Sequence, residues 1–520
     1  MVQMLTRAGW RRQSRVSIAV IILLALIVAL LLTHLLATRA HASGSLTQIS
    51  SDPYTNTSSQ HATQVEPDTF ASGSTIVSAF QSGRFYDGGS SNIGWATSTD
   101  GGATWTHGFL PGITVYDGGP WDRVSDPAVA YDLGHHTWLI SSLVISGTTG
   151  AGVVVSRSTD GGKTWSNPVT VSLAPSGAFY DKEWVVCDSR DPMFSPPILL
   201  AQKSYAGYCY VEWDDANAGI IYMSASHDGG ATWSARNSPQ TSDFGLGGQP
   251  LIQPDGTVIV PMWMTVSSNG QNYIGAYRST DQGKTWSAPV RVSTLTYAND
   301  PGSIRGGSLP SAEIDGAGTV YVVWADCRFE TNCSANDIVI SSSADGVTWS
   351  AVKRIPMDAT GSGADHLLAG IAVNPQTSGA SAQLGVVYYY FPVGSVGSSC
   401  ARNNTCPLDV GYVSSTNAGS SWSAVTQLAG PMTLSWLAST NQGYMVGDYF
   451  SASFVNGTVF PVFMVATAPS GGVYNEAAYT VSSGLLATGG NRTSAGDRVR
   501  VFPRGAPLPV TPHRVRRTAY

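Results

Sequence analysis

STDGGATW (residues 98–105) is the first of six near-copies of one short pattern in this chain of 520 residues. The later copies are STDGGKTW (158–165), SHDGGATW (226–233), STDQGKTW (279–286), SADGVTW (343–349) and STNAGSSW (415–422). The fifth copy is one residue short, and the sixth has Asn417 where the others have aspartate. A pattern that returns every 50 to 75 residues or so is typical of a repeat array such as a propeller.

Each copy is predicted to be a tight turn followed by a strand. The aspartate carboxylate can accept hydrogen bonds from nearby backbone N–H groups, and the glycines can adopt a positive φ. The threonine and tryptophan then begin the next strand, and the indole is expected to pack as a core aromatic ring. The pattern therefore indicates structure rather than chemistry.

This pattern is the Asp-box, and from about Glu66 to Ser482 the chain resembles the sialidase and BNR-repeat superfamily. In that family the turn joins the third and fourth strands of a propeller blade, on the face away from the active site. The resemblance implies an all-β propeller in which the box aspartates are structural residues.

A unit of four strands can be read backward from each box. In the fifth unit, period-2 alternation and turn residues predict strands at 308–314, 318–324, 337–342 and 350–355. The last unit, 447–482, has three strands and no box, and residues 45–50 can supply the missing strand and so remove exposed sheet edges. We predict a seven-bladed β-propeller at 66–483, with six blades, the number in sialidases, as the alternative. Comparable first strands begin near Glu66, Asp126, Glu183, Gln249, Leu309, His366 and Asp448.

The amino-terminal segment predicts export. Four arginines, the first at Arg7, precede an uncharged run at 16–37, and Ala40-His41-Ala42 follows. This is the pattern of a signal peptide, and the run is also long enough to span a bilayer. Residues 1–42 are therefore expected to be a signal peptide or a signal-anchor transmembrane helix, and both place the propeller outside the cytoplasm. Residues 43–65 are predicted to be a linker with a possible closing strand, and 484–520 a basic, proline-rich, disordered tail.

The cysteines and the net charge narrow the class of protein. Six cysteines fall into the local pairs Cys187/Cys209, Cys327/Cys333 and Cys400/Cys406, which predicts disulfides in an exported chain. No histidine lies at ligand spacing from them, so we expect no zinc site there, and we expect no metal or cofactor elsewhere. A net charge of -6 gives no reason to expect nucleic acid. The membrane is a partner only through the amino-terminal segment, and a monomer is expected.

Most first strands begin with an acidic or amide residue before proline or an aromatic residue. Equivalent positions point the same way, so these side chains should surround one end of the central channel, here called the mouth. Carboxylates that share a cleft shift one another's pKa values. The alternative is structural, because inner-strand carboxylates also accept bonds from unpaired backbone N–H groups. The matching pairs are Glu66-Pro67, Asp126-Pro127, Glu183-Trp184, Gln249-Pro250 and Asp448-Tyr449.

Four arginines are expected at the same mouth. Arg84 and Arg328 end second strands at matching places, and Arg123 and Arg305 lie just before first strands. Arginine clusters grip carboxylates through bidentate hydrogen bonds. Because sialidase substrates carry a carboxylate, the resemblance implies that these arginines, with Asp448, line a site for an anionic sugar.

The resemblance implies roles for three further residues. Sialidases use a tyrosine nucleophile, because their anionic substrate repels a carboxylate nucleophile, and the candidate here is Tyr449. Glu183 is the expected partner that takes the phenol proton, and Asp126 is the expected general acid/base. The family's Arg-Ile-Pro motif is absent, and Ser308-Leu309-Pro310 is nearest to it in shape.

The leading functional prediction is a sialidase-like glycoside hydrolase that acts on extracellular glycans. The alternative is a non-catalytic surface or secreted propeller that binds glycan or protein through the same mouth. The two differ in geometry, because an enzyme needs arginines that converge on one point with an acid and a nucleophile on either side of the scissile bond.

Overall fold

The computed structural model describes residues 45–189, 207–239, 241 and 243–489. The expected signal or anchor segment at 1–42 and most of the expected tail lie outside these residues. Within the part described, strands dominate and the only α-helix is α2 (Ser399–Asn403), which confirms the all-β class. None of the helices in these ranges is long and apolar enough to cross a membrane.

The first two predicted units form consecutive four-stranded meanders. In each, the strands follow one another in chain order and pair antiparallel, and Ser90 of the first unit pairs with Val124 of the second. The strands are β2 (Gln64–Ser72), β3 (Thr75–Arg84), β4 (Ser90–Ser98) and β5 (Thr106–Phe109), then β6 (Arg123–Asp132), β7 (Thr137–Ser146), β8 (Thr149–Ser158) and β9 (Val169–Leu173).

The next four units form separate sheets, and the fifth and sixth units repeat the four-stranded plan. The third sheet has β10 (Tyr180–Cys187), β11 (Cys209–Asp215) and β12 (Ile220–Ser226). The fourth has β13 (Phe244–Leu246), β14 (Leu251–Ile252), β15 (Val258–Thr265), β16 (Asn272–Ser279) and β17 (Val290–Thr294). The fifth has β18 (Ser311–Ile314), β19 (Val320–Asp326), β20 (Asp337–Ser343) and β21 (Lys353–Arg354), and the sixth has β22 (Asp365–Val373), β23 (Leu384–Phe391), β24 (Pro407–Ser415) and β25 (Thr426–Thr433).

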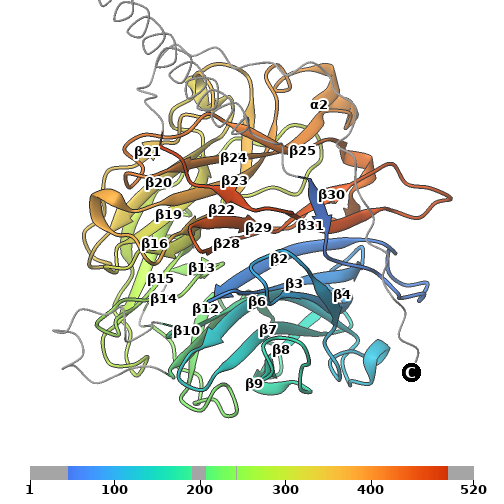
Figure 1. Ribbon diagram of the computed structural model, residues 1–520, viewed down its shortest axis with the longest axis vertical. Helices are drawn as coiled ribbons and strands as arrows, with labels where there is room; N and C mark the ends of the chain where they lie inside the picture. The colour runs from blue at the N-terminus through green and yellow to red at the C-terminus, as the bar shows by residue number, and fades with distance from the viewer. Residues whose placement is uncertain (1–44, 190–206, 240, 242, 490–520) are drawn as a thin grey trace, which may run out of the picture. The chain divides into compact units, whose positions relative to one another are not determined.

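The last unit combines the two ends of the described chain. Its strands are β28 (Ala452–Val455), β29 (Thr458–Pro461), β30 (Phe463–Ala466) and β31 (Glu476–Val481), and β32 (Leu485–Leu486) pairs with β29. A short ribbon of β26 (Ala438–Thr440) and β27 (Gly443–Met445) precedes them. β1 (Leu46–Gln48) pairs antiparallel with β31, with Leu46 opposite Val481, and Figure 1 shows this blue strand beside the red one. β1 falls in the stretch from which the sequence predicted the missing strand.

The first strands of successive units pack against one another. β2 contacts β6, β6 contacts β10, and the series continues through β14, β18, β22 and β28, which in turn contacts β2. Polar side chains on these strands accept hydrogen bonds from the backbone N–H groups of the next unit, which fixes neighbouring units in register. The described strands nevertheless form separate sheets rather than one closed sheet. The bonds are Asp68 to Val129 (2.6 Å), Gln249 to Ala312 (2.8 Å), Ser311 to Ile371 (3.2 Å) and Ser451 to Thr69 (2.8 Å).

The Asp-boxes are turns held by their own aspartate. Asp100 accepts bonds from the backbone N–H of Thr104 at 2.9 Å and from the Thr104 hydroxyl at 2.5 Å, and these bonds lower the pKa of Asp100. Gly101 and Gly102 have φ values of 72° and 88°, which a residue with a Cβ rarely adopts. The turn joins β4 to β5, the third and fourth strands of its unit, as the resemblance implies.

Three disulfides link the cysteines in the predicted pairs. The Cys187–Cys209 bridge joins the end of β10 to the start of β11, and the other two close loops within the fifth and sixth units. Disulfides form and persist in oxidising compartments, so they fit an extracellular protein.

Candidate functional site

Two of the acidic residues predicted to surround the mouth occupy matching, unusual backbone positions. β-Bulges interrupt the first strands where Glu66-Pro67 and Asp126-Pro127 lie, between Val65 and Asp68 in β2 and between Ser125 and Ala128 in β6. Glu66 has a φ of 54° and Asp126 a φ of 51°, in the left-handed region that costs an ordinary residue about 1 to 3 kcal/mol. Leu368 of β22 has a φ of 46° at a similar bulge. The bulge therefore belongs to the architecture, and only some units place a carboxylate on it.

Charged residues meet at these bulges from β2, β3, β6 and β10, from the loop before β18 and from the segment before β28. We call the set the mouth cluster, and its members act on one another electrostatically. Arg305 forms a bidentate ion pair with Asp448: Nε of Arg305 lies 2.7 Å from Oδ1 of Asp448, and Nη2 donates to Oδ2. The mouth cluster comprises Glu66, Arg84, Asp126, Asp181, Arg305 and Asp448.

Arg84 is buried at the end of β3 and is held by neutral groups. Its Nη1 donates to Oε1 of Gln81 at 3.1 Å and to the carbonyl of Gly89 at 3.0 Å. The Gln81 amide in turn donates to Glu66 and, at 3.0 Å, to the Ser125 hydroxyl. This relay places a guanidinium and a carboxylic group side by side under the mouth.

Asp126 acts electrostatically on several neighbouring carboxyl groups. Burial raises the pKa of Glu66 well above its usual range, and the charges of Asp126 and Asp448 add to this effect. Burial and the charge of Asp126 also raise the pKa of Asp181 to about 6. The raised pKa of Glu66 and that of Asp181 show that burial and mutual repulsion set the carboxyl groups of this cluster apart from ordinary surface carboxyl groups.

Tyr449 lies beneath the cluster with its hydroxyl already bonded. The phenol donates to the backbone carbonyl of Pro127 at 3.0 Å, and the side chain is buried. Burial raises the pKa of Tyr449 well above its usual range, and the nearby carboxylates Glu66 and Asp126 raise it further. In this arrangement the phenol donates to the strand that carries Asp126.

Glu183 is one residue out of register with the expected position. In β10 the bulge falls between Asp181 and Trp184 and contains Lys182 and Glu183, so Lys182 is the counterpart of Glu66 and Asp126. The Lys182 ammonium lies 3.8 Å from the ring centroid of Tyr449 and 4.3 Å from that of Trp184, a cation–π contact with both. Burial raises the pKa of Glu183 well above its usual range, and Lys182 opposes the shift. Sequence reasoning missed Lys182 because it aligned the units on the residue before the aromatic ring.

The other two predicted arginines form ion pairs with aspartates that are not members of the cluster. Arg123 pairs with the half-exposed Asp87 at 2.5 Å and stacks over Phe85 with 4.2 Å to the ring centroid. Arg328 pairs with Asp326, with Nε 2.9 Å from Oδ1 and Nη2 2.7 Å from Oδ2. Of the four arginines, Arg84 and Arg305 thus act on each other electrostatically, whereas Arg123 and Arg328 are ion-paired with Asp87 and Asp326.

A second group of titratable residues at the start of β22 was missed. Asp365 is buried, burial together with the charge of Asp300 raises its pKa well above the usual range, and the Tyr297 hydroxyl donates to Asp300. The Asn336 backbone N–H donates to Asp365 at 2.7 Å. The signal was present, because Asp300-Pro301 repeats the acid-before-proline pattern, but Asp300 lies in a loop rather than on a first strand.

The surface has a hollow that is not near this chemistry. It has a volume of about 240 Å³ and lies at the first box, lined by Trp95, Lys163 and four threonines. Its lining has no carboxylate, so the mouth cluster is the better candidate for a catalytic site.

Comparison with known proteins agrees with the sequence resemblance. Residues 146–370 match the model of the BNR repeat-like domain. A sialidase from Micromonospora viridifaciens is 26% identical over 182 residues, which cover 32% of this chain and 28% of that protein. A sialidase from Clostridium perfringens is 26% identical over 189 residues, covering 32% and 48%. The resemblance to the sialidase and BNR-repeat superfamily is confirmed, and the matches span less than half the length of these curated relatives.

Solved structures with a similar course of the chain were also found. The NanB sialidase from Streptococcus pneumoniae has a TM-score of 0.40 and 14% identity, over 85% of this chain and 70% of that one. An ulvan lyase bound to its saccharide has a TM-score of 0.48 and 11% identity, over 85% and 96%. A protein of unknown function from Dyadobacter fermentans has a TM-score of 0.43 and 16% identity, over 68% and 95%. Nothing about the chemistry of the mouth cluster follows from them.

Proposed function

We propose that this protein is a sialidase-like glycoside hydrolase that cleaves extracellular glycans at the mouth cluster of a seven-bladed propeller. The seven first strands in mutual contact and the pairing of β1 with β31 support the blade count. The observation that carries the function is the position of Asp126. Its charge acts on the buried carboxyl groups of Glu66, Asp181 and Glu183 at one place, and glycoside hydrolysis uses carboxyl groups in pairs.

In this proposal Asp126 is the general acid/base and Asp181 is the second carboxyl group. The pKa of Asp181, about 6, keeps it mostly ionised at pH 7, as a base or a stabiliser of positive charge must be. Arg84 and Arg305 supply the positive charge that holds an anionic sugar, and Asp448 fixes the direction of Arg305. Arg123 and Arg328 have no part in this version of the site, because Asp87 and Asp326 hold them.

Tyr449 takes a positioning role in the proposal. Its bond to the Pro127 carbonyl fixes the residue that follows Asp126, and so helps to hold Asp126 in its left-handed conformation. Glu183, next to Lys182, is likewise a supporting group rather than the partner of a tyrosine nucleophile.

Release of fluorophore from aryl glycosides tests the proposal. The full chain and its Asp126→Asn variant are assayed on a sialoside, a glucuronide and neutral hexosides and pentosides. We expect turnover of the anionic glycosides by the wild type and a loss of about 100-fold or more in kcat for Asp126→Asn. Asp122→Asn is the matched control, because Asp122 is an exposed carboxylate four positions earlier that only accepts a bond from Gly147.

Each other outcome has a defined meaning. Turnover of neutral glycosides alone would refute the role of Arg84 and Arg305 in substrate selection. Equal loss in Asp126→Asn and Asp122→Asn would refute the acid/base assignment. No turnover by a folded, disulfide-bonded protein that still binds glycans would favour a binding propeller. Arg305 is already ion-paired with Asp448, and this observation favours the binding propeller as the second candidate function.

A further inference from the structure

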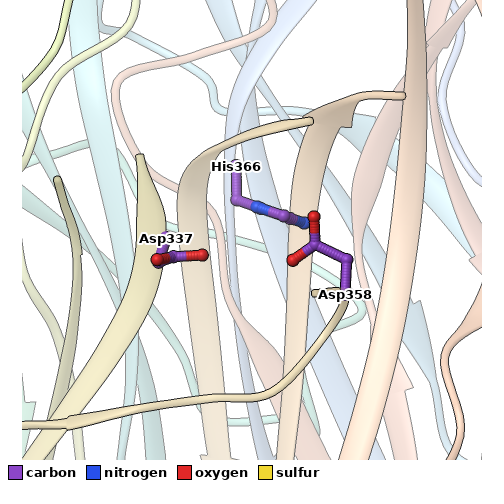
Figure 2. A group of neighbouring side chains, drawn as sticks. All are labelled: Asp337, Asp358 and His366. Carbon is purple, nitrogen blue, oxygen red and sulfur yellow. The ribbon is translucent and has the colours of Figure 1, made fainter. Parts of the chain in front are cut away.

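Three potential metal ligands meet between the fifth and sixth units, outside the mouth cluster. Asp337 is the first residue of β20, Asp358 lies between β21 and β22, and His366 is the second residue of β22. One donor atom of each lies within 4.8 Å of the others. Figure 2 shows the imidazole of His366 directed toward the carboxylate of Asp358, with the carboxylate of Asp337 on the adjacent strand.

Each of these side chains is oriented by another group. Nη2 of Arg354 lies 2.7 Å from Oδ1 of Asp337 and also bonds Oδ1 of Asp358. The Ser362 hydroxyl donates to Asp358. Nδ1 of His366 lies 3.2 Å from the Asn336 carbonyl, and donation to this carbonyl leaves Nε2 with its lone pair. Groups that orient metal ligands in this way are a regular part of metal sites.

One ligand atom is buried without a partner. Oδ2 of Asp337 accepts no hydrogen bond from the described residues, and Asp337 is only 2% exposed. A buried carboxylate oxygen in this state bears the loss of its hydration without compensation. The missing partner of this oxygen is a separate observation from the grouping of acidic residues. A cation would supply such a partner.

The acidic side chains around Asp337 and Asp358 also favour the binding of a cation. Glu330 interacts electrostatically with Asp337, Asp358 and Arg354. Three carboxyl groups therefore lie around a single guanidinium. A bound divalent cation would add positive charge among these groups, and Arg354 would stay on Oδ1 of Asp337 and Oδ1 of Asp358.

We propose that Asp337, Asp358 and His366 form a binding site for a divalent transition metal of the zinc type. One imidazole nitrogen with two carboxylates suits zinc or manganese, whereas calcium and magnesium prefer oxygen ligands alone. The ligands come from neighbouring sheets, so the metal would join the fifth unit to the sixth. No metal site was predicted from the sequence.

The test uses the full chain after treatment with a chelator. Zinc, manganese and calcium are each titrated by calorimetry, and thermal unfolding is followed with and without each ion. We expect one zinc site per chain, a rise in Tm with zinc, and little response to calcium. All cysteines are in disulfides, so thiols of the described residues do not compete for zinc.

Two variants locate the site. His366→Gln and Asp337→Asn should each weaken zinc affinity at least 30-fold, and His136→Gln, which changes an exposed histidine, should leave it unchanged. Circular dichroism shows whether each variant folds, and either variant alone suffices if the other does not. Zinc binding that is absent in the wild type, or equal in the wild type and a folded site variant, would overturn the proposal.

Discussion

Arg305 and Asp448 are 143 residues apart in sequence and form a bidentate ion pair in the mouth cluster. Their side chains are 18% and 22% exposed, so the pair is mostly shielded from water. It joins the loop before β18 to the segment before β28. The strength of this pair therefore bears on both the stability of the mouth and the charge that a substrate would meet.

We expect Asp448→Asn to lower the free energy of unfolding by about 2 kcal/mol, because it leaves a mostly buried guanidinium without its carboxylate. Denaturant unfolding of Asp448→Asn, Arg305→Gln and the double variant measures the coupling between the two side chains. Asp87→Asn breaks the Arg123 pair at a carboxylate that is 47% exposed and should cost less than about 0.5 kcal/mol. Similar losses at both sites would show that the Arg305 pair is no stronger than a surface pair.

The Tyr449→Phe variant tests whether Tyr449 acts as a nucleophile or as a positioning residue. If the phenol only holds the Pro127 carbonyl, the variant should keep kcat within about tenfold of the wild type and lose about 1 kcal/mol of stability. The aryl glycoside assay used for Asp126→Asn supplies kcat and KM. A loss in kcat as large as that of Asp126→Asn would restore Tyr449 as the nucleophile.

An aspartate in an Asp-box should be replaceable by asparagine. Asn417 accepts the Ser421 N–H at 2.9 Å, the same bond that Asp281 accepts from Thr285 at 2.9 Å. We expect Asp281→Asn to cost less than about 1 kcal/mol, Asp281→Ala to cost about 1 to 2 kcal/mol, and neither to change catalysis. Thermal unfolding and the glycoside assay check both expectations, and a loss of turnover in Asp281→Asn would give the box a chemical role.

Glu212 should make stability depend on pH. Burial raises the pKa of Glu212 from 4.5 to about 8, with Lys182 opposing the shift. Between these values the unfolded chain has lost the proton and the folded chain has kept it. The contribution of Glu212 to the free energy of unfolding is therefore greatest below pH 4.5 and falls by up to about 1.4 kcal/mol per pH unit until pH 8.

Denaturant unfolding at pH 5, 6.5 and 8 measures this dependence. Glu212→Gln, which cannot ionise, should flatten the fall between pH 5 and 8. Asp255→Asn, at an exposed carboxylate, should leave the fall as it is in the wild type. Parallel curves for the wild type and Glu212→Gln would show that Glu212 has an ordinary pKa.

The fold class could be predicted from the sequence because the interactions that form its turns and strands join residues close together in the chain. Asp100 and Gly102 form their turn from residues within one short pattern, and the strands on either side show their own alternation. The three cysteine pairs are also close in sequence, so their pairing needed little knowledge of the fold. The registers of the first strands were harder to predict, because the bulge that contains Lys182 and Glu183 depends on the pairing of β10 with β11.

The candidate site was accessible only in part. Asp126 and Arg305 were expected at the mouth because repeated units present equivalent positions together. The engagement of Arg123 by Asp87 and of Arg328 by Asp326 follows from the loops that carry the partners. A repeat pattern gives no information about such loops, since they differ from unit to unit.

The sequence by itself determined the all-β repeat, the box turns and the disulfide pairs, because the interactions that form them lie within a few residues or within one hairpin. Only the tertiary structure decided which charges meet. Arg305 reaches Asp448 and His366 comes near Asp337 through the packing of different sheets. Coulombic interaction and desolvation depend on distance and burial in space, and these arise only when the units pack together.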